Sequence, residues 1–317
     1  MIENRALILL DESDRAGNAP GSSPQMMSFE LDMLGEPLSF RIQIARKHAR
    51  LSDVAPLART LSDRLCLAIV NKLGAGGRDV PCRKGCSACC RYLVPLSVPE
   101  AFRLREDISL LPVEQGKAIL QACLDTAKEI LAKSPDELTS HEESSQNAIC
   151  HSERSEESPA STAQTPRLAQ GDSLEAVAKS QGTNDPRQTR RIGRWYAGLD
   201  LPCPYLSENV CISYERRPIA CREHLVTDSA AQCGCESTDE PSVVPMPVSV
   251  LECLGQLAAE LEQSDVEAVM LPLALPWALK NHDRSQRTWP TTEMVQRFVE
   301  ILKAAAKKTQ TRDQVCG

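Results

Sequence analysis

The chain is poor in aromatic residues, which make up only 3% of its 317 positions. A core with so few large rings has to rely on Leu, Ala, Val and Ile, and metal binding then becomes a useful additional source of stability. The hydrophobic share of 42% is nevertheless too high for a disordered or fibrous chain. The composition therefore predicts a globular protein with one sizeable core or two small ones.

The sequence also has no segment that resembles an export signal or a membrane span. Asp11 ends the short apolar run at residues 6–10, and no basic region or small-residue cleavage site accompanies that run. The longest apolar stretch, Val269 to Leu279, is far shorter than the roughly 20 residues that cross a bilayer, and prolines interrupt it. We therefore expect a cytoplasmic protein without a membrane partner.

The sequence also has no excess of basic over acidic residues. The formal net charge is −7, and residues 134–188 contribute ten acidic and four basic side chains to it, which leaves the rest of the chain nearly neutral. Because nucleic-acid-binding proteins usually carry a basic surface, we expect no nucleic-acid partner. The sequence also lacks a Gly-x-Ser-x-Gly elbow and a Walker loop, so a hydrolase has no support.

Helical spacing of apolar residues dominates what is present. It predicts helices from Asp53 to a stop at Gly74, from about Pro99, after Pro112, over 250–261 and over 291–306. Two partly alternating runs, 28–34 and 38–44, predict a hairpin. The expected fold class is mainly α with an irregular cysteine-rich metal-binding core, and a small N-terminal β-hairpin.

Composition divides the chain into five segments. Residues 1–79 hold the hairpin and a helix, and residues 241–317 are a C-terminal helical segment. Between them, residues 80–133 and 189–240 form the two halves of a cysteine-cluster domain. Residues 134–188 are rich in Ser, Glu, Gln and Thr and contain no aromatic residue, so they bury too little apolar surface to offset the entropy of ordering. We predict a disordered insertion there.

The strongest signal is a cluster of four cysteines within nine positions. In a reducing compartment such closely spaced thiols bind metal or carry out redox chemistry. Spacings of two to three residues let a turn aim successive sulfurs at one ion, and Gly85 supplies backbone freedom for that turn. Adjacent cysteines project differently, so one of the last two can face a second ion. The four are Cys82, Cys86, Cys89 and Cys90.

A second group of cysteines lies in a loop-like region with several prolines. Together with the first cluster these thiols make eight, enough for two four-thiolate sites. Eight thiolates around two divalent ions leave excess negative charge, which nearby basic side chains, Arg217 and Arg222 among them, are placed to offset. The four cysteines of this group are Cys203, Cys211, Cys221 and Cys233.

These residues carry a family resemblance. The run Cys82-x-x-Gly-Cys-Ser-x-Cys-Cys90, followed by Cys203-Pro-Tyr-Leu, Cys211-Ile-Ser-Tyr214 and Arg217-Pro-x-x-Cys-Arg222, resembles the YkgJ-type CxxCxxCC family of zinc- or iron-chelating proteins. The resemblance covers about residues 80–235 without the insertion. It implies that the eight cysteines are the ligands of Zn2+ or of an iron-sulfur cluster, in one or two centres. Activities proposed for the family include iron-sulfur oxidoreductase and a module of flagellin lysine N-methylases.

Further residues extend this candidate site. Cys235 and His224 are possible extra ligands, although a partly exposed loop histidine is the more ordinary interpretation of His224. Arg217, Arg222 and Tyr214 are expected to surround the ligands, with the tyrosine packed over the metal loops. A strained, reducible disulfide between adjacent cysteines of the first cluster is the redox alternative.

Other patterns are weaker. The Cys-x3-Cys-x2-Cys spacing at 82–89 equals that of radical-SAM enzymes, but Ala88 replaces the usual aromatic residue and no repeated strand-helix pattern follows. The segment 73–77 is glycine-rich but ends a helix, whereas a nucleotide-binding fingerprint requires a strand before it. Cys66, Cys123 and Cys253 lie on helical apolar stripes and are expected to be buried in the core. The sequence identifies no substrate and no protein partner.

Overall fold

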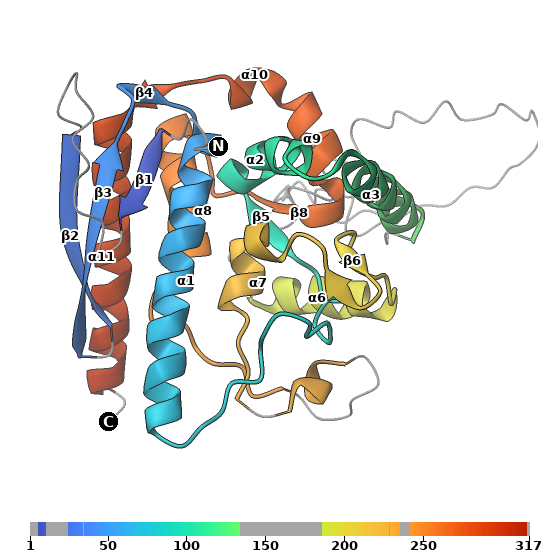
Figure 1. Cartoon of the computed structure of the whole chain (residues 1–317), viewed down its shortest axis with the longest axis horizontal. Coiled ribbons are helices and arrows are strands. Elements are labelled where there is room, and N and C mark those ends of the chain that lie inside the picture. Colours follow the sequence, from blue (N-terminus) through green and yellow to red (C-terminus); the bar gives the residue numbers. More distant parts are fainter. Residues whose placement is uncertain are drawn as a thin grey trace, which may run out of the picture.

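The computed structural model describes residues 6–10, 25–33, 35–133, 186–227, 229–234 and 241–315. Helices predominate, and the strands form small antiparallel sheets (Figure 1). The largest sheet is N-terminal and has the order β1-β3-β2, from strands β1 (Leu7–Leu10), β2 (Gln25–Met33) and β3 (Glu36–Ile44). The mainly α fold class with small N-terminal strands is therefore confirmed.

The hairpin of β2 and β3 follows from strict alternation of buried and exposed side chains. Phe29, Leu31 and Met33 face the core, and the intervening residues face outward. Phe29 lies directly opposite Phe40, with ring centroids 5.1 Å apart. Such an aromatic pair adds about 1 kcal/mol beyond the area it buries. Gly35 has φ of +86° at the turn, a conformation that glycine adopts without strain.

The remaining elements follow in chain order. The α-helices are α1 (Leu51–Ala75), α2 (Val98–Ser109), α3 (Val113–Lys133), α6 (Pro186–Gly198), α7 (Ile219–Glu223), α8 (Val250–Glu262), α9 (Ala274–Lys280), α10 (His282–Ser285) and α11 (Thr291–Val315). Short 3-10 helices are η1 (Tyr214–Arg216), η2 (Ala230–Cys233) and η3 (Leu271–Leu273). The short paired strands are β4 (His48–Ala49) with β9 (Trp289–Pro290), β5 (Pro95–Ser97) with β8 (Ala268–Met270), and β6 (Leu206–Ser207) with β7 (Val210–Cys211).

The main core joins both ends of the chain. The N-terminal sheet, α11, α1 and α8 lie side by side, and their apolar side chains form one cluster (Figure 1). Leu61 and Leu65 of α1 pack there with Leu254 of α8 and Phe298 of α11, all nearly inaccessible to solvent. Burying side chains of this size contributes about 2 kcal/mol each. The C-terminal helices therefore complete the core that the N-terminal segment begins.

A second apolar cluster supports the cysteine region. It lies between the N-terminal end of α1, helices α2 and α9, and the β5-β8 pair, and Phe102 stacks on Trp277 at a centroid distance of 5.2 Å. Tyr205 is buried in this cluster, and several cysteines pack at its edge: Cys203, Cys211 and Cys221. The cysteine loops are therefore anchored on a hydrophobic core.

Helix α6 returns the chain to the end of α3. Ile192 and Tyr196 pack against Ile130 of α3, and the indole N–H of Trp195 donates a 3.3 Å hydrogen bond to the carbonyl of Lys133, the last residue of α3. The predicted disordered insertion lies almost wholly outside the described residues. Its predicted end at residue 188 is too late, because α6 begins at Pro186.

The predicted boundaries differ from the structure in two other places. Helix α1 passes through Gly74 and ends at Ala75, where Gly76 donates its N–H to the carbonyls of Leu73 and Lys72. The apolar run near the N-terminus is strand β1, which pairs antiparallel with β3. Among the described residues, no helix combines the length and the apolar character that crossing a membrane requires.

The junction of α3 and α6 makes residues 134–185 replaceable. Trp195 lies at Lys133, and the nine steps along α6 from Pro186 to Trp195 rise about 14 Å, so a Gly/Ser linker of about eight residues, which spans up to about 26 Å, can join the helices. We expect this replacement to raise the free energy of unfolding in urea by less than about 2 kcal/mol, because closing a shorter loop costs less entropy and this cost changes by only about 0.6 kcal/mol for each doubling of loop length.

A chain with a scrambled sequence over residues 134–185 is the matched control for that replacement, since it separates the effect of length from that of sequence. A loss of several kcal/mol in the shortened chain, with the scrambled chain unchanged, would mean that the α3-α6 junction needs the longer connection.

Candidate metal centre

The first cysteine cluster is a series of tight turns. The N–H of Cys86 donates to the carbonyl of Arg83 at 3.0 Å, that of Cys90 to Ser87 at 2.9 Å, and that of Tyr92 to Cys89 at 3.0 Å. Gly85 has φ of +94°, which the expected tight backbone at this position requires. These turns give the four cysteines a defined backbone, although the segment between α1 and β5 has neither helix nor strand.

The second group is carried by a hairpin and a short helix. Strands β6 and β7 place Cys211 opposite Leu206, and the turn residues Glu208 and Asn209 both have positive φ, as in a type I′ turn. Pro218 then precedes α7, which carries Cys221 in its first turn. Cys233 ends η2 and is buried.

Backbone and side-chain contacts join the two cysteine regions. The N–H of Cys203 donates a 2.7 Å hydrogen bond to the carbonyl of Cys90. The ammonium of Lys84 lies 3.1 Å from a carboxylate oxygen of Glu215. Arg91 donates to the carbonyl of Asp200 at 2.8 Å and pairs with its carboxylate at 3.1 Å. The ion pairs are exposed and contribute little stability, but they fix the register of the two regions. Chain segments more than 100 residues apart are therefore adjacent.

One set of thiols gathers around Cys221. Burial raises the pKa of Cys221 well above its usual value, and the neighbouring sulfurs of Cys203, Cys89 and Cys211 raise it further. Burial also raises the pKa of Cys203 to about 12, against a backbone hydrogen bond from Tyr205 and with an added effect of Cys211. These mutual effects require the sulfurs to lie within electrostatic reach of one another.

A second set of thiols gathers around Cys233. Burial raises the pKa of Cys233 to about 11, and Cys89, Cys82 and Cys86 add to the rise. The pKa of Cys82 is raised by burial and then by Cys86 and Cys89, against a backbone hydrogen bond from Val226. Cys89 therefore influences thiols of both sets.

The pKa values of the adjacent cysteines Cys89 and Cys90 are shifted in opposite directions. Their thiols hydrogen-bond to each other, which lowers the pKa of Cys89 to about 7 against the effect of burial and raises that of Cys90. Cys90 is also influenced by Cys203 and Cys221, so it belongs to the first set. All eleven described cysteines are free thiols, and the redox disulfide between the adjacent pair is not formed here.

The donor set suits a metal that prefers sulfur. Across the described residues, no three His, Cys, Asp or Glu side chains lie close enough together to hold a metal ion. The eight predicted ligands are instead grouped within electrostatic reach in two overlapping sets. Four thiolates are the usual ligands of structural zinc and of iron-sulfur clusters, so the residues present fit either group.

Positive charge lies beside these thiols. Arg217 lowers the pKa of Cys82, Cys89 and Cys211, so its guanidinium favours the thiolate form at both sets. Its Cζ lies 3.9 Å from the centre of the Tyr214 ring, in a cation-π contact that positions the charged group. Tyr214 thus acts on the thiols indirectly, by holding the guanidinium of Arg217 in position.

Arg222 has a different environment from the one expected. Its guanidinium pairs with Asp63 of α1 and donates to the carbonyls of Arg217 at 3.0 Å and Glu215 at 2.7 Å. Burial lowers the pKa of Arg222, and Asp63 opposes that effect. The hydrogen bonds of Arg222 therefore go to oxygens and attach the second cysteine region to α1.

His224 lies at the end of α7, with its ring edge-on to Tyr92 at a centroid distance of 5.7 Å. Its Nε2 is buried and has no hydrogen-bond partner among the described residues, and burial lowers the pKa of the ring. A neutral imidazole with an unpaired nitrogen is the form that binds metal, so His224 keeps its place as a candidate extra ligand. Cys235, the other candidate, lies outside the described residues.

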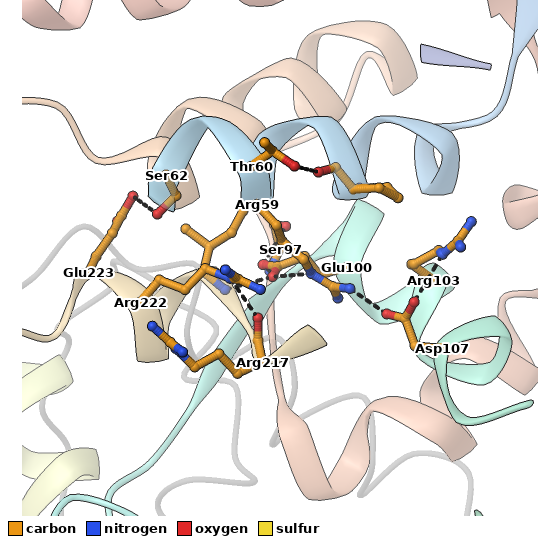
Figure 2. A network of polar contacts seen from close by, with 12 residues as sticks. Arg59, Thr60, Ser62, Ser97, Glu100, Arg103, Asp107, Arg217, Arg222 and Glu223 are labelled. Carbon is orange, nitrogen blue, oxygen red and sulfur yellow. Dashed lines mark hydrogen bonds and ion pairs between the residues drawn. The ribbon is translucent and has the colours of Figure 1, made fainter. Parts of the chain in front are cut away.

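A buried carboxylate holds the start of α7. Glu100 of α2 is fully buried, and its Oε1 accepts a 2.9 Å hydrogen bond from the N–H of Ile219. Its Oε2 accepts from the hydroxyl of Ser97 at 3.0 Å (Figure 2). Arg59 of α1 lies 3.7 Å from Glu100 and 2.5 Å from Asp107. Burial lowers the pKa of Arg59, but the two carboxylates outweigh this and the pKa is raised.

A second carboxylate holds the other end of α7. Glu223 accepts hydrogen bonds from the N–H of Val250 at 2.7 Å and from the hydroxyl of Ser249 at 2.9 Å, at the N-terminus of α8. Burial raises its pKa to about 7 against these bonds. Helix α7 is only five residues long, so these two carboxylates fix Cys221 more firmly than the helix alone would.

Sequence reasoning missed this network. Glu100 follows the pattern Ser-x-x-Glu, which indicates the start of a helix, and the structure does contain that capping box. The pattern gives no sign that the same carboxylate also receives Ile219, which is 119 residues away. Comparison of the chain with family models, with curated proteins and with solved structures finds no match.

The network predicts a large stability effect at Arg59. Replacing Arg59 with Met leaves Glu100 and Asp107 buried without their shared cation, and breaking a buried pair typically costs about 3 kcal/mol. We expect Arg59→Met to lower the free energy of unfolding in urea by about that amount. Lys117→Met is the matched control, because the pair of Lys117 with Glu114 is exposed and contributes less than about 1 kcal/mol. Equal losses in the two variants would contradict the proposed role of Arg59.

Proposed function

We propose that this chain is a metal-binding protein that holds its metal through the eight cysteines of its two clusters. The observation that carries the proposal is the 2.7 Å hydrogen bond from Cys203 to Cys90, which brings the two clusters together across 113 positions of the sequence. Around that bond the thiols influence one another's ionisation. Thiolates that share a small volume repel one another, and a divalent cation relieves that repulsion.

The grouping of the thiols favours two centres. One centre would use Cys90, Cys203, Cys211 and Cys221, and the other Cys82, Cys86, Cys89 and Cys233. Cys89 influences members of both sets and is the candidate for a shared position. Arg217 lies between the sets and would offset part of the negative charge that eight thiolates leave around two divalent ions.

Zinc is the first candidate, with a closed four-thiolate shell that leaves no open position and gives an inert structural or sequestering site. An iron-sulfur centre is the second candidate, since the same ligands accept it, and it would make the chain an electron-transfer protein or an oxidoreductase. Eleven free thiols suit a reducing compartment, so we place the protein in the cytoplasm. The methyltransferase module remains an implication of the family resemblance alone.

Single substitutions separate the two centres. We expect the zinc-loaded chain to contain about two ions, and Cys203→Ser and Cys82→Ser each to remove about one of them, because each removes one of four thiolates. Elemental analysis of the purified variants measures this. Cys253→Ala is the control, since Cys253 is buried and none of the eight cysteines is among the groups that shift the pKa of its thiol, and it should keep both ions. Retention of both ions in the two serine variants would refute the ligand assignment.

Anaerobic purification identifies the metal. We expect a colourless protein with about two zinc ions per chain, because four thiolates close a zinc shell without added sulfide. Elemental analysis and a visible spectrum measure this. A brown protein with iron and matching inorganic sulfide would assign the iron-sulfur centre instead. A chain that contains neither metal and gains none when zinc is added under reducing conditions would overturn the proposed function.

A further inference from the structure

A cavity of about 640 Å³ lies on the far side of α2 from α7, between α2, α9 and α10. Its walls are mostly apolar: Phe102, Ile108, Leu120, Leu275, Ala278 and Leu279. The volume is within the range of about 300–1,000 Å³ that is usual for small-molecule sites. None of the eight proposed metal ligands lines it, so the cavity is separate from the metal centre.

Two large apolar side chains at this cavity are exposed. Leu279 of α9 has 61% of its surface accessible and Leu120 of α3 has 41%. Exposed leucines scattered over a surface need no explanation, but here they border one hollow that already contains Phe102 and Leu275. A ligand with an apolar body would remove this surface from water.

A buried hydroxyl lies at the same cavity. Ser52, in the first turn of α1, is only 2% exposed, and its Oγ has no hydrogen-bond partner among the described residues. Ser52 lines the cavity together with the polar side chains at its rim. Leaving a buried hydroxyl unpaired is unfavourable, so a ligand that reaches it with a polar atom supplies the missing hydrogen bond.

The rim carries uncompensated positive charge. The one carboxylate that lines the cavity, Glu106, is already paired with Arg50 at 2.9 Å and with Arg103 at 2.8 Å. Arg105 also lines the cavity, is exposed, and makes no hydrogen bond or ion pair to another residue in the described part of the chain. His282 is at the same rim and adds positive charge when protonated.

We propose that this cavity binds a small amphipathic carboxylate. Its carboxylate would contact Arg105 and the Ser52 hydroxyl, and its hydrocarbon chain would lie against Phe102 and Leu275. A cationic or neutral amphiphile of the same length fits the apolar walls but loses the guanidinium contact. The charge of the head group therefore selects the ligand.

Titration calorimetry on the full chain, with decanoate as the probe, tests this proposal. We expect decanoate to bind at least about tenfold more tightly than decyltrimethylammonium or decanol, which corresponds to about 1.4 kcal/mol, since only decanoate forms a charge-assisted hydrogen bond with the guanidinium. Equal affinity for the three probes, or no heat of binding with decanoate up to about 1 mM, would overturn the proposal.

Two variants, each with a matched control variant, test whether decanoate binds in this cavity. Ala278→Trp fills the cavity and should abolish decanoate binding, while Ala278→Ser should leave it unchanged. Arg105→Ala should weaken binding about tenfold, and Arg287→Ala, which removes an exposed charge that does not line the cavity, should leave it unchanged. Because Arg105 is exposed, its variant keeps the fold even if the tryptophan does not. Unchanged decanoate affinity in Arg105→Ala would refute the assignment.

Discussion

The buried carboxylate of Glu100 is the constraint on which the cysteine region depends. It caps its own helix through Ser97, it balances Arg59 of α1, and it receives the backbone N–H of Ile219, the first residue of α7. One side chain thus joins three parts of the chain at a point with no access to water. A buried ionised group is stable only when every lone pair has a partner, so the position of α7 is fixed by the need to satisfy Glu100.

That constraint connects the hydrophobic core with the thiols. Helix α7 carries Cys221, and Glu223 at its other end is bound by the N-terminus of α8 in the main core. Arg222 between them reaches back to Asp63 on α1. The irregular loops around the thiols contain few elements that could hold themselves in place. They take their position from polar groups that are rooted in the helices, and any metal would add to this arrangement rather than create it.

Local patterns allowed much of the helical frame to be predicted from sequence. Apolar spacing located α1, α3, α8 and α11, and alternation located the β2-β3 hairpin, because each of these signals lies within one element. Strand β1 was missed since its four residues are strand only by pairing with β3. Boundary errors at Gly74 and Pro186 have the same origin, as local propensity is weak at helix ends.

The candidate site was also only partly predictable from the sequence. Cysteine spacing indicated which thiols to group, and the approach of Cys203 to Cys90 is consistent with it. Spacing does not indicate which sulfur belongs to which set, because that depends on how a hairpin and a five-residue helix pack on the second apolar cluster and on α1. The ion pair of Arg222 with Asp63 and the double use of Glu100 are likewise long-range, and no window of sequence contains both partners.

The contact of Trp195 with the end of α3 has an architectural consequence. The two halves of the cysteine region are each attached to the same helical frame by their own contacts, so their placement does not depend on how the chain runs from Lys133 to Pro186. In that sense the two halves are complementary fragments that assemble on one scaffold.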